Sequence, residues 1–120
     1  MSWMDSAQLD LLARFLDLSS QRQSLITGNI ANVDTPGYRT KDIDFHGELE
    51  RALEGQPGDS QAFVQEVPGL VTRPDGNNVS VDRESLLLSE VQLQFSIAEQ
   101  LIKSQFKTLS LAINEGGSSS

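Results

Sequence analysis

The chain has 120 residues, no cysteine and a formal net charge of −8, from 17 acidic and 9 basic side chains. This length allows one modest domain, and the lack of cysteine excludes disulfides, thiol nucleophiles and cysteine-based metal sites. The acidic balance disfavours nucleic acid and anionic membrane surfaces as partners. The apolar runs are short and the first residues lack a signal-peptide pattern, so we expect no membrane span and no cleaved signal peptide.

Residues 1–33 form the first predicted segment, which is helical from about Asp5 to Asn32. The most regular apolar row recurs every seven residues and comprises Leu11, Leu18 and Leu25. The opposite side carries Asp10, Arg14, Asp17, Gln21 and Ser24. The apolar arc is wider than a two-stranded seam requires, which predicts contact with more than one neighbouring helix. Periodicity by itself favours an ordinary amphipathic helix on a globular core.

A dense break follows this helix, at residues 28–38. Pro36 disfavours helical backbone at Thr35 and lacks an N–H group, so the helix should end near residues 32–36. Gly37 can adopt the positive φ of a type II turn with Pro36 before it. The polar side chains that could bond the freed backbone groups are Asn29, Asn32 and Asp34. Composition alone predicts a helix stop and nothing more.

Residues 34–81 are predicted to be a partly extended, flexible middle segment with little core. Residues 39–45 could be extended, residues 48–54 could form a helical turn or two, and residues 55–60 have a linker composition. Residues 62–67 could form another short strand. Residues 70–72 and 79–81 could pair as a hairpin around the turn signal Pro-Asp-Gly at 74–76.

Residues 82–115 are predicted to form a C-terminal helix with Asp82 as its N-cap. An apolar seam of nearly four heptads runs along it and comprises Leu88, Val91, Phe95, Ala98, Ile102 and Leu109. A different face carries Leu86, Leu93, Ile97 and Leu111. We expect the helix to end at Asn114 before two glycines, and residues 116–120 to be a flexible tail.

These segments predict a mainly α protein, in which long N-terminal and C-terminal helices pair as a coiled coil around a middle segment of loops and a short β-hairpin. The two apolar stripes can pair within one chain. The remaining apolar faces must then meet other subunits or stay exposed, and monomers rarely expose more than a few hundred Å² of contiguous apolar surface. The sequence therefore predicts a subunit of a helical assembly.

Residues 29–38 read Asn-Ile-Ala-Asn-Val-Asp-Thr-Pro-Gly-Tyr and resemble the family-wide motif of the flagellar basal-body rod proteins. The positions that carry this motif are Asn29, Ile30, Ala31, Asn32, Thr35, Pro36, Gly37 and Tyr38. Residues 39–45 and 75–84 resemble the proximal-rod members more closely than other rod proteins. The short middle segment also fits, and the resemblance covers nearly the whole chain.

The resemblance implies a structural subunit without enzymatic activity or cofactor. Such a subunit would be exported by the flagellar type III apparatus without cleavage and polymerised into the torque-transmitting rod of the basal body, in the periplasmic space. Its partners would be other copies of itself, other rod subunits, the adaptor between rod and membrane ring, and the export gate. Phe45 and Leu49 match a short gate-recognition pattern of related subunits, although core packing explains Phe45 equally well.

Two other functions remain open from the sequence. One is another rod or axial adaptor subunit of the same apparatus. The other is a small acidic hydrolase, since paired carboxylates can act as general acid and base. The residues that would serve such a hydrolase are Asp42, Asp44, Glu48 and Glu50. His46 has no nucleophile or zinc-ligand partner at a recognisable spacing, which disfavours a catalytic or metal role for it.

Overall fold

The computed structural model describes residues 5–55 and 62–119 as an elongated, mainly helical molecule with a longest dimension of 73 Å. Its elements are α1 (Ser6–Ala31), β1 (Lys41–Ile43), α2 (Phe45–Leu53), β2 (Val64–Glu66) and α3 (Val81–Ser119). The predicted class of long terminal helices around a short antiparallel β element is confirmed. The predicted linker beyond Gly55 and the last residue of the predicted tail lie outside the described residues.

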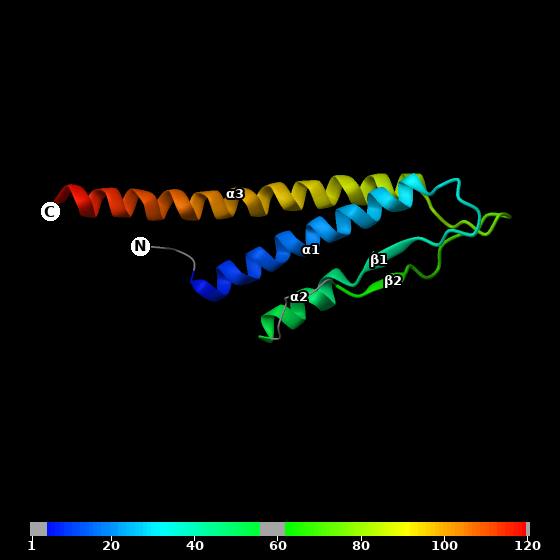
Figure 1. Cartoon of the computed structure of the whole chain (residues 1–120), viewed down its shortest axis with the longest axis horizontal. Coiled ribbons are helices and arrows are strands. Elements are labelled where there is room, and N and C mark those ends of the chain that lie inside the picture. Colours follow the sequence, from blue (N-terminus) through cyan, green and yellow to red (C-terminus); the bar gives the residue numbers. More distant parts are fainter. Residues whose placement is uncertain (1–4, 56–61, 120) are drawn as a thin grey trace.

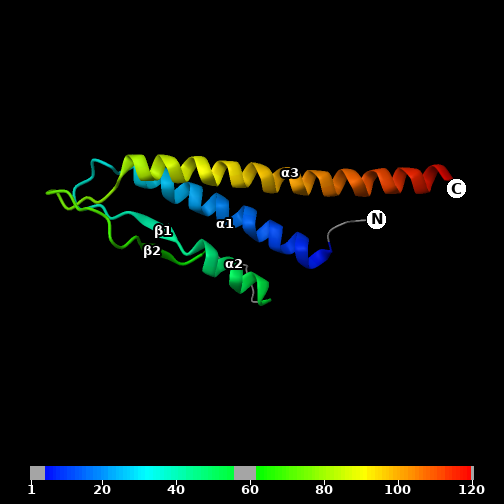
Figure 2. The ribbon, with the colours of Figure 1, turned by 180° about the vertical axis from the view of Figure 1, so that it is seen from behind.

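The elements form three strips, with α1 in the middle (Figures 1 and 2). On one side α1 lies against the first part of α3 and diverges from it toward the N-terminus (Figure 1). On its other side α1 contacts α2 and β1. The prediction that the N-terminal helix touches more than one helix is therefore confirmed. The loop between α1 and β1 and the loop between β2 and α3 gather at the end of the molecule where α3 begins (Figure 2).

The first turn of α1 is closed by a capping box. The Asp5 carboxylate accepts from the Gln8 backbone N–H at 2.8 Å, and the Gln8 side chain accepts from the Asp5 N–H at 2.9 Å. These bonds satisfy donors that a helix start otherwise leaves unpaired. Further along, Arg14 was placed on the polar side, yet its side chain is buried. It is covered because α2 packs there and Glu48 accepts from its guanidinium at 3.4 Å.

The small apolar core lies between α1 and the middle segment. Leu18, Ile43 and Ala62 are buried together. The partly buried side chains packed around them are Leu25, Phe45 and Leu49. The apolar row that contains Leu18 and Leu25 thus packs on the middle segment. It was predicted to pair with the C-terminal helix instead. The reason for the difference is that β1 and α2 fold back along α1.

The two short strands, which α2 separates in the sequence, pair directly with each other. Lys41 lies opposite Glu66, and Ile43 opposite Val64, in an antiparallel ladder. The predicted hairpin between residues 70–72 and 79–81 is wrong, because neither stretch is assigned as strand in the described chain. Residues 73–77 instead make a tight turn, closed by a bond from the Arg73 N–H to the Asn77 carbonyl at 2.8 Å. Whether the middle segment is flexible stays a prediction.

The start of α3 differs by two residues from the prediction. The helix begins at Val81, and the Ser80 hydroxyl accepts from the Arg83 backbone N–H at 3.3 Å. Ser80 therefore takes the capping role that was assigned to Asp82. Asp82 lies in the first turn, where the helix dipole still favours its negative charge.

The far end of α3 also differs from the prediction. The helix continues past Asn114 and through Gly116 and Gly117 to Ser119. Glycine lowers helix stability by about 1 kcal/mol relative to alanine but does not block the backbone hydrogen bonds. The predicted stop was therefore too early, and residues 116–119 extend the helix.

Along α3, apolar side chains remain on the surface over most of its length. Those that are at least two-fifths exposed are Val81, Leu86, Leu93, Ile97, Phe106, Leu109, Leu111 and Ile113. α1 covers only one side of α3 and diverges from its distal half (Figure 1). The expected surplus of apolar surface is thus present. Among the described residues no helix combines the length and hydropathy needed to cross a membrane.

Candidate functional site

The C-terminal end of α1 turns sharply within the sequence motif. The Asn32 N–H bonds to the carbonyls of Gly28 and Asn29, and its side-chain amide donates to the Gly28 carbonyl at 2.8 Å. The Tyr38 N–H then bonds to the Thr35 carbonyl at 3.2 Å across a Pro-Gly pair. Gly37 has φ of +77°, the left-handed conformation that the type II turn requires. The predicted turn is confirmed.

Asn29 is the centre of the motif. Its side chain is fully buried and bonds to three other segments. The amide nitrogen donates to the Lys41 carbonyl at 2.8 Å and to the Glu84 carboxylate. The amide oxygen accepts from the Lys41 N–H at 3.1 Å and from the Tyr38 hydroxyl at 3.0 Å. One asparagine therefore joins the end of α1 to β1 and to the first turn of α3.

Asn77 closes the end of α1 from outside the helix. Its amide nitrogen lies 2.9, 3.0 and 2.9 Å from the carbonyl oxygens of Asn32, Val33 and Thr35. The Arg73 guanidinium donates to the Val33 carbonyl as well. Asn32 caps α1, and Val33 and Thr35 lie in the turn that follows the helix. Asn77 and Arg73 therefore bind the turn after α1 from a segment forty or more positions away in the chain.

Asn78 binds the strand that leaves the motif. Its amide oxygen accepts from the Thr40 N–H at 2.6 Å and from the Thr40 hydroxyl at 2.8 Å. Its own N–H bonds to the Tyr38 carbonyl at 3.3 Å. The backbones of Gly37 and Gly76 approach closely here, since a Cβ at Gly76 would lie 3.3 Å from the Gly37 Cα. Both segments are thus held together by backbone and amide contacts.

Glu84 places a carboxylate in the interior of this site. Its side chain is only 1% exposed, and it accepts from Asn29 and from the Arg83 guanidinium, the latter at 2.6 Å. A buried charge is costly unless it is paired and hydrogen-bonded, as this one is. Burial, and next the Glu84 charge, raise the pKa of the Tyr38 hydroxyl above its usual value. Tyr38 therefore stays protonated and keeps donating to Asn29.

We call residues 28–41 and 73–84 together the helix junction. Every bond described above lies within it, and it ties the end of α1 to the start of α3. Of the other motif residues, Ile30 is half-buried, and Ala31 and Pro36 are exposed. Sequence reasoning missed Arg73, Asn77, Asn78 and Glu84 as functional residues. The only available signal was the resemblance of residues 75–84 to proximal-rod proteins.

The predicted helix-packing residues fall into three groups by exposure. Val91 and Ala98 are buried along α3, and Leu18 is buried on α1. The half-buried members are Leu11, Leu25, Leu88, Phe95 and Ile102. Leu109 is 44% exposed, because it lies on the distal part of α3, from which α1 diverges.

The two candidates for export-gate recognition are packed into the fold. The Phe45 ring meets the Phe15 ring edge to face, with centroids 5.2 Å apart, and the Arg22 guanidinium lies 6.0 Å from the Phe45 centroid. Leu49 packs on the core formed around Leu18. The structure therefore presents neither side chain as a free recognition element.

The acidic side chains are engaged in structural contacts, although Asp42 and Asp44 also line a pocket of about 330 Å³. Asp42 makes two bonds to Arg22, and Asp44 caps α2 by accepting from the Gly47 N–H at 3.2 Å. Glu48 accepts from Arg14 and Arg51, and Glu50 pairs with His46 at 2.8 Å. Within the described residues no group of histidines and carboxylates could hold a metal ion. Because each of these carboxylates is already bound to a neighbouring group, the arrangement favours a structural role for the cluster over the hydrolase alternative.

Comparison with known proteins identifies the family. The profile described as "Flagella basal body rod protein" matches residues 16–39, which include the whole motif. Flagellar basal body rod protein FlgB of Borrelia hermsii is 32% identical over 88% of this chain and 94% of that protein. The FlgB proteins of Escherichia coli and Salmonella typhimurium are 31% and 32% identical, over 91% and 92% of this chain and 97% of each relative. The chain belongs to the flagellar basal body rod proteins of the FlgB type.

Proposed function

We propose that this chain is a structural subunit of the proximal rod of the bacterial flagellum and assembles with other copies of itself and with other rod subunits. The observation that carries this proposal is the apolar surface of α3. Leu86, Leu93 and Ile97 are each more than half exposed although they lie on a long, regular helix. Burial of such side chains against neighbouring subunits would supply the main driving force for assembly.

The helix junction gives the subunit the stiffness that a drive shaft needs. Asn29, Asn77 and Glu84 fix the end of α1 against the start of α3 through buried hydrogen bonds. A helix pair held in this way transmits force without sliding, because each bond has a defined geometry. The subunit acts through packing, and it carries out no catalysis in this proposal.

Export and location follow from the family rather than from the fold. We propose that the flagellar type III apparatus exports the chain without cleavage and that it occupies the rod in the periplasmic space, beside the adaptor to the membrane ring and the export gate. Phe45 and Leu49 remain candidates for recognition by that gate. Since both are packed in the folded chain, the gate could bind them only before the chain folds.

The test replaces the exposed apolar face while leaving the fold intact. Leu86→Asp with Leu93→Asp puts two charges on α3 at positions that are 62% and 63% exposed. In flagellated cells whose own subunit is replaced by the variant, we expect export to persist while rods and swimming are lost. Helix content of the purified variant, measured by circular dichroism, should equal that of the parent chain.

A matched control adds two aspartates at polar positions of the same helix. Ser89→Asp with Ser96→Asp has the same seven-residue spacing and lies at exposed polar positions of the same helix. We expect this control to build rods and swim normally. Normal rods in the Leu86 and Leu93 variant would rule out the apolar face as an assembly surface, and the proposed function would lose its main support.

A further inference from the structure

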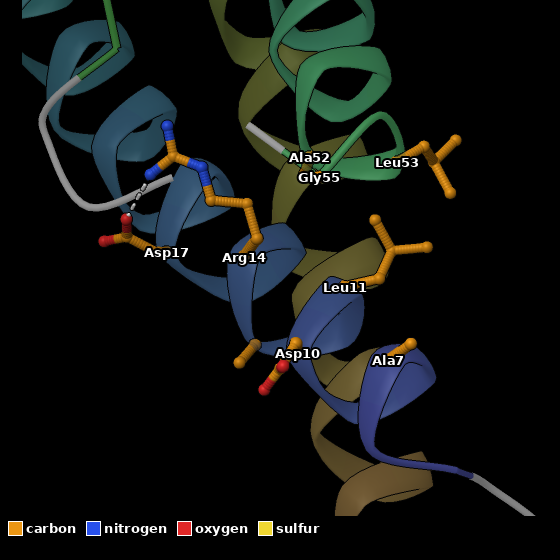
Figure 3. A pocket seen from close by; sticks show the side chains of 9 residues that line it. Ala7, Asp10, Leu11, Arg14, Asp17, Ala52, Leu53 and Gly55 are labelled. Carbon is orange, nitrogen blue, oxygen red and sulfur yellow. Dashed lines mark hydrogen bonds and ion pairs between the residues drawn. The ribbon is translucent and has the colours of Figure 1, made fainter. Parts of the chain in front are cut away.

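A groove lies between the first half of α1 and the end of α2, with a volume of about 580 Å³ (Figure 3). Its apolar wall comprises Ala7, Leu11, Ala13, Ala52 and Leu53. Leu53 is 68% exposed at its edge. Small side chains on facing helices leave room for the larger apolar side chains of another helix. The groove therefore has the shape of a receptor for an apolar helix face.

The rim of the groove carries two carboxylates and one guanidinium. Asp10, Arg14 and Asp17 line it, and Asp17 accepts from Arg14 at 2.8 Å (Figure 3). Asp10 therefore supplies the negative charge that Arg14 does not offset. An apolar floor with a negative rim suits a helix that carries apolar side chains flanked by positive ones.

The distal half of α3 has this composition. Phe106, Leu109 and Ile113 recur at the spacing of one helix face and are 65%, 44% and 65% exposed. Lys103 and Lys107 border one side of this face, and both are exposed; Lys103 also pairs with Glu99 at 3.1 Å. Although the whole chain has a net charge of −8, residues 100–114 contain these two lysines and no acidic residue. We call residues 102–113 the distal strip.

The distal strip of the same chain cannot fill the groove. Among the described elements α2 contacts α1 but not α3, and α1 lies between them (Figure 1). A second copy faces no such restriction. We propose that the groove between α1 and α2 receives the distal strip of a second copy, with Lys107 facing Asp10.

This contact joins two different surfaces of the same chain, so it is heterologous. Repetition of a heterologous contact produces a ring or an open helical polymer rather than a closed dimer. The inference deepens the proposed function by naming one contact between rod subunits, and it rests on that function only for its biological meaning. Purified protein is enough to test the contact itself.

The native chain contains no cysteine, which allows a clean cross-linking test. Leu53→Cys and Phe106→Cys are made on separate chains, both at exposed positions, and the two proteins are mixed and oxidised at the highest soluble concentration. A disulfide forms only where two Cα atoms come within about 7 Å. We expect the mixed disulfide to exceed that of a control pair, Phe63→Cys with Phe106→Cys, by about tenfold. Phe63 is 73% exposed and lies outside the groove.

A charge exchange provides the second arm. Asp10→Lys should reduce the mixed disulfide, and Lys107→Glu in the partner chain should restore it. A yield no higher than the control pair, or dimers formed by the Phe106→Cys protein alone, would overturn the inference, since the latter would show that two distal strips pair with each other. If cross-linking fails while the Leu86 and Leu93 variant still abolishes rods, the groove inference falls and the proposed function stands.

Discussion

Replacement of Asn29 by alanine is the most direct test of the helix junction. The Asn29 side chain is fully buried and makes four hydrogen bonds, which reach Tyr38, both backbone groups of Lys41, and Glu84. The alanine variant keeps the helix, because alanine has the highest helix propensity. Any loss of stability must therefore come from the junction rather than from α1 itself.

The magnitude follows from the bonds that are lost. A typical intramolecular hydrogen bond contributes about 1 kcal/mol net, and a buried group left without a partner costs about 1–3 kcal/mol. Arg83 still pairs with Glu84 after the change, so that carboxylate is not left alone. We therefore expect Asn29→Ala to lower the free energy of unfolding by about 4 kcal/mol, a large share of the 5–15 kcal/mol typical of a domain.

The measurement is urea denaturation of the purified chain, followed by far-ultraviolet circular dichroism. Asp34→Ala is the control, because Asp34 lies in the same motif but is exposed. It should change the free energy of unfolding by less than about 0.5 kcal/mol. If Asn29→Ala costs no more than the control, the buried bonds contribute nothing net, and the junction cannot be what holds α1 to α3.

Three further changes test other parts of the helix junction by the same denaturation assay. Asn77→Ala leaves three carbonyls at the end of α1 without this partner and should cost about 2 kcal/mol; a loss near zero would mean that water replaces the amide. Gly76→Ala should cost more than about 1 kcal/mol, because φ is +87° and the new Cβ would lie 3.3 Å from the Gly37 Cα; a stable variant would contradict the close approach. Burial and Glu84 raise the pKa of Tyr38 above 10.0, so stability should be full below that pH and fall as pH rises through the folded pKa. Tyr38→Phe should remove this alkaline decline, and a decline that persists would assign it to another group.

Features that depend on neighbouring residues could be predicted from the sequence. The end of α1 and the turn after it follow from Pro36 and Gly37, whose backbone limits act within a few residues. The long α3 follows from a heptad pattern, which indicates a helix whichever partner the helix packs against. The predicted cap of α3 was two residues from Ser80, whereas the predicted stop at Asn114 was five residues early.

Features that depend on distant residues could not be predicted. Arg14 is buried because Glu48, 34 positions away, comes to lie beside it. Asn77 binds the end of α1 across more than forty positions, and no periodicity marks such an amide. Extended segments were predicted at residues 39–45 and 62–67, where β1 and β2 lie, but their pairing was not predicted, because short apolar stretches all pair equally well in principle. The tertiary fold determines which of these stretches pair.

The two ends of the molecule have different chemistry, and this difference suits a polymerising subunit. At the helix junction Glu84, Asn29 and Asn77 are buried and mutually satisfied, an arrangement that accepts one relative position of α1 and α3. An apolar contact alone would tolerate sliding, since dispersion and burial carry little directionality. Away from the helix junction the two helices diverge (Figure 1), and many apolar side chains of α3 stay exposed. A subunit whose internal geometry is fixed by polar bonds can leave its apolar surface for neighbours, because that surface is not needed to set its own shape.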